Sequence, residues 1–145
     1  MRRVALLAAL GALLATLPPA LAKPRKDPDG RYAGRLLKEN GKASETKIKM
    51  RVTKDGRRIR KLSTTTVAFC IGPTIYDNHI AILTVYIPTI KVRRNGRFKG
   101  TSKPSEGTEF KYKGRRVGRR VRGEIDVRVV NCFSDEKFRA KRVGR

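Results

Sequence analysis

The sequence has few of the residues that metal sites and catalytic centres usually require. It contains two cysteines, one histidine and 12 acidic residues among 145. One histidine and two cysteines far apart in sequence cannot supply the closely spaced ligands of a structural zinc site. Glycine-rich nucleotide-binding loops and the Gly-x-Ser-x-Gly nucleophile motif are missing as well. The sequence therefore predicts no metal, no cofactor and no enzymatic activity.

The longest apolar run lies at the N-terminus. Arg2 and Arg3 precede a largely apolar segment, residues 4–17, which two prolines and Ala20–Leu21–Ala22 follow. A basic start, a short apolar segment and small residues before the cleavage point are typical of a secretory signal peptide. The run is shorter than the roughly 20 apolar residues of a membrane-spanning helix. We expect cleavage after Ala22, export of the remaining chain, and no transmembrane segment.

Basic residues greatly outnumber acidic ones. The 36 Lys and Arg against 12 Asp and Glu give a net charge of +24, and loss of Arg2 and Arg3 with the signal peptide leaves 34 − 12 = +22. Such a surface attracts polyanions, and salt weakens that attraction steeply. For an exported protein, anionic cell-wall polymers, phospholipid headgroups and acidic polysaccharides fit better than nucleic acid. The alternative is a generally basic surface that only keeps the protein soluble.

The basic residues cluster in sequence, and the aromatic residues lie opposite them. Alternation along a strand places Phe98, Phe110 and Tyr112 on the face away from the adjacent basic side chains. These aromatics are therefore expected in the core and not in a base-stacking surface. We assign polyanion binding to nine basic residues: Arg57, Arg58, Arg60, Lys61, Arg115, Arg116, Arg119, Arg120 and Arg122.

Strand patterns repeat along the exported chain. Glu45–Thr53 alternates apolar and basic residues, and Asn40–Gly41, Asp55–Gly56 and Asn95–Gly96 predict tight turns between strands. Ile80–Ile87 is almost wholly apolar, as in a central strand buried on both faces or a short buried helix; its β-branched residues favour the strand. Roughly eight strands without a helix predict one all-β domain, either a β-sandwich or an antiparallel β-barrel.

The expected organisation is simple, with one folded domain. It consists of a signal peptide (1–22), a flexible basic leader (23–30) and a single all-β domain (31–145). Polar segments within the domain are expected to be loops: Pro73–Asn78, Thr101–Gly107 and Ser134–Glu136. Oligomeric state does not follow from these patterns.

The apolar pentapeptide Val67–Ile71 carries the first cysteine and is predicted to end a buried strand. An oxidising compartment lets the two cysteines of an exported chain form and keep a disulfide. No Cys-x-x-Cys motif indicates redox activity. We therefore predict one structural bridge, Cys70–Cys132.

Acidic residues offer two weak catalytic candidates. Glu124 and Asp126 share one face of a predicted strand, about 7 Å apart, as in the carboxylate pair of a glycosidase. Arg122 and Arg128 extend the same row, so a solvated ladder with cross-strand ion pairs explains the two acids more simply. His79 follows two residues after an aspartate and is expected to be a loop histidine beside a turn, not half of an acid–base pair.

Three functions remain open at this point. The favoured one is a secreted, non-enzymatic β-domain that binds anionic polymers. The second is a secreted inhibitor or ligand-binding β-barrel that uses a rigid loop such as Pro73–Asn78 or Thr101–Gly107. The third is an extracellular polysaccharide-active enzyme carried by Glu124 and Asp126.

The spacing of glycines, aromatics and cysteines resembles that of small secreted bacterial β-proteins of uncharacterised function, over most of the exported chain. The residues that carry the resemblance are Gly30-x-Tyr32-x-Gly34, the strand ending in Cys70, Asn95–Gly96-x-Phe98, Gly118, Gly123, and Cys132 with Phe138–Arg139–Ala140. These motifs imply an all-β fold with one disulfide. They assign no catalytic residue.

Overall fold

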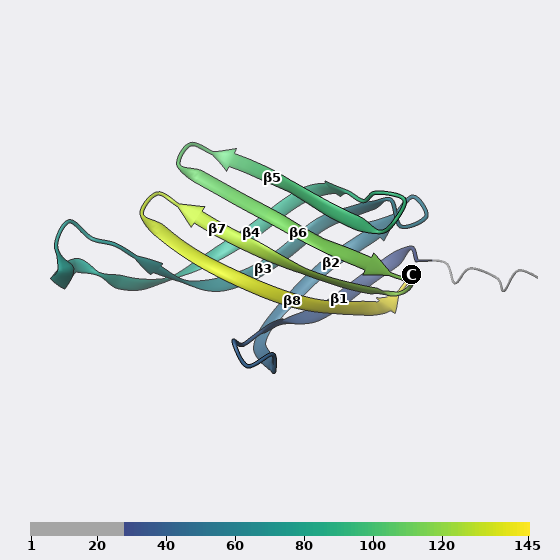
Figure 1. Ribbon diagram of the computed structural model, residues 1–145, viewed down its shortest axis with the longest axis horizontal. Helices are drawn as coiled ribbons and strands as arrows, with labels where there is room; N and C mark the ends of the chain where they lie inside the picture. The colour runs from purple at the N-terminus through teal and green to yellow at the C-terminus, as the bar shows by residue number, and fades with distance from the viewer. Residues whose placement is uncertain (1–27) are drawn as a thin grey trace, which may run out of the picture.

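The structure, a computed structural model, describes residues 28–145 (Figure 1). Eight antiparallel strands form one sheet and no α-helix occurs among the described residues, which confirms the all-β prediction. The predicted signal peptide lies outside the described residues. The strands are β1 (Gly30–Leu37), β2 (Ala43–Thr53), β3 (Arg58–Cys70), β4 (His79–Lys91), β5 (Arg97–Ser105), β6 (Thr108–Val117), β7 (Arg120–Val129) and β8 (Cys132–Gly144).

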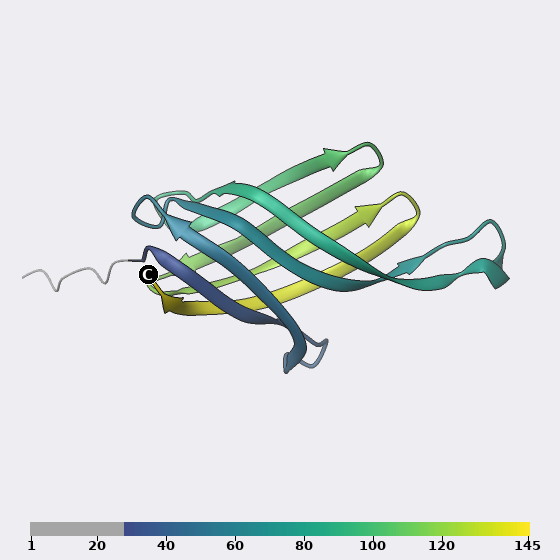
Figure 2. The ribbon, with the colours of Figure 1, turned by 180° about the vertical axis from the view of Figure 1, so that it is seen from behind.

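The strand order is β4-β3-β2-β1-β8-β7-β6-β5. Neighbours in the sheet are neighbours in the chain, except where β1 pairs with β8. A second long-range pairing joins the end of β3 to the start of β8, where Phe69 lies opposite Phe133 and Cys70 opposite Cys132. In Figures 1 and 2, strands β5–β7 cross over β2–β4, so the two halves of the sheet face each other.

The core lies between these halves and follows the predicted alternation. Ile48, Met50 and Val52 of β2 are buried, and the basic residues between them are exposed. Opposite halves contribute to one buried cluster, with Ile59 from β3 and Phe110 from β6. Since apolar side chains fill the inner face, the outer face carries the basic residues.

The predicted disulfide is confirmed. Cys70 and Cys132 are bonded and lie directly opposite each other in the β3–β8 pairing. Around them, the amide N of Ile71 donates to the carbonyl O of Asn131 at 3.0 Å, and the Asn131 side chain donates to the Ile71 carbonyl. This junction fixes the distal end of the β3–β4 hairpin to the β7–β8 turn.

The prediction for Ile80–Ile87 was right about the strand and wrong about its place. The segment belongs to β4, at one end of the sheet, and not to a central strand buried on both faces. Ile80 and Ile82 are 71% and 78% exposed. Both side chains point to the outer face of the sheet, away from the core, so no second layer covers them. The distal part of the β3–β4 hairpin also projects beyond the other strands (Figures 1 and 2).

Three further predictions need correction. Within Val67–Ile71 only Ala68 and Cys70 are buried, because the other side chains point to the open face of the same hairpin. Thr101–Gly107 is mostly strand; its polar composition reflects the exposed position of β5 at the other end of the sheet. Ser134–Glu136 belongs to β8, and the true turn precedes Cys132.

Polar residues point inward in that part of β8, which explains why the segment resembles a loop in sequence. The Thr66 Oγ1 lies 2.9 Å from the Ser134 Oγ and donates to Glu136, and the Ser134 hydroxyl also donates to Glu136, at 3.0 Å. A small hydrogen-bonded group thus replaces apolar contacts beside the disulfide. Within residues 28–145 there is no helix long and apolar enough to cross a membrane.

Candidate functional site

Six basic residues from six adjacent strands form one continuous row on the outer face. Cross-strand partners link each to the next, from Arg97 on β5 to Lys47 on β2. The basic row consists of Arg97, Arg115, Arg122, Arg139, Arg35 and Lys47. All six side chains are exposed. At about 4.8 Å between neighbouring strands, the row spans roughly 24 Å.

The basic row has no internal charge compensation. Like charges directly opposite each other across a sheet destabilise it, and among the described residues no ion pair involves a member of the row. Arg35 donates to the carbonyl oxygens of Ser44 and Glu45, at 3.1 and 3.5 Å, which holds its side chain without neutralising it. An anionic ligand would relieve this repulsion.

The neighbouring row shows how the same sheet compensates charge elsewhere. Lys99, Lys113, Glu124 and Lys137 lie opposite one another in that order. The Lys113 Nζ is 2.8 Å from Glu124 Oε2, which confirms cross-strand ion pairing at this acid. Asp126 pairs along its own strand, 3.3 Å from Arg128. Acidic residues are therefore present in the next two rows of the same face and absent from the basic row.

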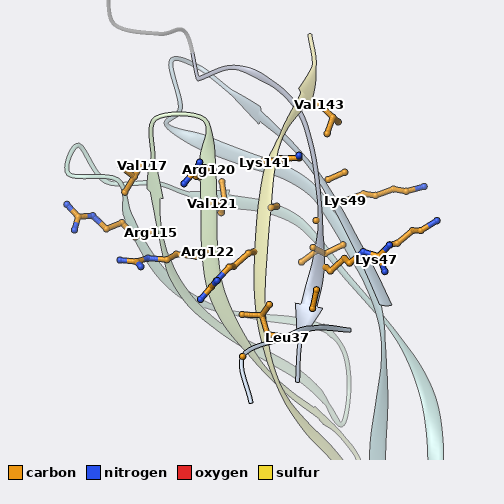
Figure 3. A pocket seen from close by; sticks show the side chains of 18 residues that line it. Leu37, Lys47, Lys49, Arg115, Val117, Arg120, Val121, Arg122, Lys141 and Val143 are labelled. Atoms are coloured by element: carbon orange, nitrogen blue, oxygen red, sulfur yellow. The ribbon is translucent and has the colours of Figure 1, made fainter. Parts of the chain in front are cut away.

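A hollow of about 1070 Å³ lies over β1, β2, β6, β7 and β8, along the basic row (Figure 3). In Figure 3, Arg115 and Arg122 project on one side of the hollow and Lys47 on the opposite side. None of the lining residues is acidic. Eight are basic: Arg35, Lys47, Lys49, Arg115, Arg120, Arg122, Arg139 and Lys141.

Small residues at the β1–β8 junction shape the floor of the hollow. Gly34 lies opposite Ala140 of β8 and Ile48 of β2. A Cβ at Gly34 would overlap the carbonyl group of Arg139, so only glycine allows this approach of the two strands. Ala33 and Ala140 also line the hollow. Close packing of β1 on β8 thus brings Arg35 and Arg139 side by side.

The nine basic residues selected from the sequence lie in different parts of the structure. Arg115, Arg120 and Arg122 line the hollow. Arg116 points inward; its Nε donates to the Gly56 carbonyl at 3.0 Å and its Nη1 to Gly118 at 3.2 Å. Arg119 is exposed in the β6–β7 turn.

The other four of the nine lie outside the hollow. Arg57 is in the β2–β3 turn, and Arg58, Arg60 and Lys61 begin β3. Arg60 belongs to a shorter row of its own, opposite Arg51 of β2.

The selection from the sequence missed six of the nine basic residues of the site. Arg35, Lys47, Lys49, Arg97, Arg139 and Lys141 belong to the basic row or the hollow and were not selected. Three of them, Arg35, Lys47 and Lys49, are isolated basic residues in alternating strands. The other three lie in basic stretches of the sequence, residues 91–103 and 137–145, from which no residue was selected. Alternation alone could have placed them on the outer face, but not beside one another.

The other catalytic candidate, His79 with Asp77, also has structural partners. The Asp77 carboxylate accepts from Thr74 Oγ1 at 2.6 Å, within a short 3₁₀ turn (Ile75–Asp77). The His79 ring lies 3.1 Å from the main-chain oxygen of Asp77 and not beside its carboxylate. Asp77 lies in a turn as predicted, but the histidine does not lie in a loop, because His79 begins β4 opposite Cys70.

Salt bridges lower the pKa values of two carboxyl groups, those of Glu124 and Glu109. A hydrogen bond from Lys113 lowers the pKa of Glu124 below its ordinary value, and hydrogen bonds from Lys111 and Lys103 lower the pKa of Glu109. Since the folded-state pKa is lowered, each pair stabilises the fold above the unfolded pKa of about 4.3. That contribution is lost as pH falls through the folded-state value.

We expect Lys113→Ala to raise the Glu124 pKa toward the ordinary value for glutamate while the pKa of Glu109 stays low. Glu109 keeps both of its own lysines in this variant, at 3.0 and 3.1 Å, and serves as the internal control. Carboxyl ¹³C chemical shifts followed from pH 7 to pH 2 measure both groups. An unchanged Glu124 titration in the variant would contradict the assigned ion pair.

Residues 28–145 contain no group of three His, Cys, Asp or Glu side chains arranged to hold a metal ion. Comparisons with protein-family models, with curated proteins and with solved structures found no match to this chain.

Proposed function

We propose that the protein is an exported, non-enzymatic β-domain that binds linear anionic polymers along the basic row and its hollow. The observation that carries the proposal is the uncompensated row across six strands. Folding alone gives no reason to align six like charges, since each like-charged pair opposes folding. A ligand with repeated negative charges turns that repulsion into attraction.

The shape of the row favours a polymer over a single small anion. Six positive groups along roughly 24 Å match several successive charges of an extended chain. One phosphate or sulfate group would contact only one or two of them. Phe98 and Phe110 are 2% and 4% exposed, so no aromatic platform accompanies these positions to stack bases. Anionic cell-wall polymers and acidic polysaccharides are the proposed ligands.

Binding of a heparin oligosaccharide and of purified anionic wall polymer, measured at several salt concentrations, tests the proposal. For single-stranded polyanions the logarithm of the binding constant falls with the logarithm of salt concentration by about 0.7 per neutralised charge. Six contacts give a slope of about −4, by the same relation. The triple variant Arg115→Gln, Arg122→Gln, Arg139→Gln should reduce the slope by about two and weaken binding strongly at low salt.

A second triple variant distinguishes binding by the basic row from binding by net charge alone. Arg57→Gln, Arg58→Gln, Arg60→Gln removes the same three charges from the β2–β3 end, outside the hollow. We expect a clearly smaller loss of affinity in this control. Equal losses in the two triples would mean that total charge governs binding and that the basic row is not a site.

A further inference from the structure

The distal part of the β3–β4 hairpin has an exposed apolar face. Val67 lies opposite Ile82, and Phe69 opposite Ile80, so these four side chains share one face. Their exposed fractions run from 44% for Phe69 to 78% for Ile82. Phe133 of β8 adds to the patch, with its ring centroid 5.5 Å from that of Phe69. Contiguous exposed apolar patches commonly mark interaction surfaces.

This face lies in the longest stretch of the chain that has no lysine or arginine. Leu62–Ile90 contains no lysine or arginine, whereas the whole chain has 36. Asp77 is the only acidic residue there and is used in the tip turn. If this face only had to be soluble, it would carry exposed basic residues, as the outer faces of the remaining strands do.

The two strands at the ends of the sheet, β4 and β5, differ in how they are protected against pairing with another chain. An unpaired strand edge invites pairing with another chain, and proteins usually block it with lysine or proline. β5 carries Arg97, Lys99, Lys103 and Pro104. From Ile80 to Ile87, β4 carries neither a charge nor a proline.

The unprotected edge is also free in space. Among the described residues β4 pairs only with β3. Figure 1 shows its first residues diverging from β5 toward the tip of the hairpin. The first part of β4 thus presents free backbone groups next to an exposed apolar face.

We infer that two copies of the chain associate by antiparallel pairing of β4 with β4, about a twofold axis near Ile82. A lipid bilayer could cover the apolar side chains, but it offers no partner to the free N–H and C=O groups of an open edge. A second β4 satisfies those groups and places Ile80 and Ile82 of the two copies side by side. Two identical edges are self-complementary under twofold symmetry. This inference does not rest on polyanion binding.

Charge confines the contact to this segment. The nearest lysine or arginine along β4, Lys91, is nine positions from Ile82, which is about 30 Å of strand. The screening length at physiological salt is about 8 Å. In an antiparallel pair the two Lys91 residues point to opposite ends, so the basic bodies stay well apart. The Cys70–Cys132 bond holds the hairpin in place before association.

Sedimentation equilibrium of the exported chain, residues 23–145, tests the inference in about 0.5 M salt, where repulsion between the bodies is screened. We expect a reversible dimer for the wild type and at least tenfold weaker association for Ile82→Lys, which places a charge at the twofold axis. Thr101→Lys is the matched control, because it adds one charge to an exposed position of the other edge strand, β5. It should leave the dimer unchanged.

Hydrogen exchange locates the contact independently of any variant. Amides of residues 79–86 should become more protected as protein concentration rises, whereas those of β5 should not. A wild-type monomer at high concentration, or a dimer that Ile82→Lys does not weaken, would overturn the inference. So would a monomer that binds phosphatidylglycerol vesicles through Ile82, since the apolar face would then serve a membrane.

Discussion

Replacing Cys70 by serine is expected to lower the free energy of unfolding by about 4 kcal/mol, because the lost bond closes a long loop in the unfolded chain. Cys70 and Cys132 are 62 residues apart in sequence, and the entropy that a cross-link removes from the unfolded state grows with that separation. For a domain of this size the loss corresponds to a fall of roughly 15 °C in Tm. Denaturant unfolding of oxidised wild type and variant measures it.

Two comparisons make the expected loss specific. Wild type treated with a reductant should unfold like the double variant Cys70→Ser, Cys132→Ser. Polymer binding by the folded variant should persist, since no cysteine lines the basic hollow. If reduction left the Tm unchanged, the bridge would contribute nothing and the β3–β8 pairing alone would hold the hairpin.

Phe138→Ala is expected to cost about 3–5 kcal/mol, the usual loss when a fully buried aromatic side chain is truncated. Phe138 is 1% exposed and belongs to the central apolar cluster. Its ring lies over Gly123 of β7, where a Cβ would come within 2.8 Å of the ring. Gly123 itself therefore has no side chain that could fill the space that the ring leaves.

Phe133→Ala is the matched control for this prediction. Phe133 lies on the same strand, but it is 45% exposed on the outer face. We expect it to lose clearly less stability, mainly its edge-to-face contact with Phe69. Both variants should be compared at low protein concentration, where self-association does not contribute. Equal losses would mean that burial does not determine the cost of truncation at these two positions.

Local alternation was enough to predict much of this fold. Along Lys47–Val52 the basic and apolar residues alternate without interruption, and the structure buries the three apolar ones, Ile48, Met50 and Val52. The Asn–Gly and Asp–Gly turns fall between strands as expected. The disulfide could also be predicted, because two cysteines allow only one pairing.

Properties that depend on strand neighbours distant in sequence could not be predicted. Ile80–Ile87 has the composition of a central strand, but composition does not specify which strand ends a sheet. The basic row depends on Arg35 lying opposite Arg139, and no local pattern connects residues so far apart. The polar side chains of Ser134 and Glu136 indicated a loop because their buried partner, Thr66, is also remote in sequence.

The position of β8 has a consequence for how the molecule comes together. β8 pairs with β1, β7 and the end of β3, and it is made after all seven other strands. The hairpins can form one by one as the chain emerges, but the two halves cannot join until β8 is present. Cys70 likewise has no cysteine partner until Cys132 has been made. A nascent chain stopped before β8 would therefore hold two sheets that no strand joins, β1–β4 and β5–β7, with apolar inner faces open to chaperones and proteases until the last strand arrives.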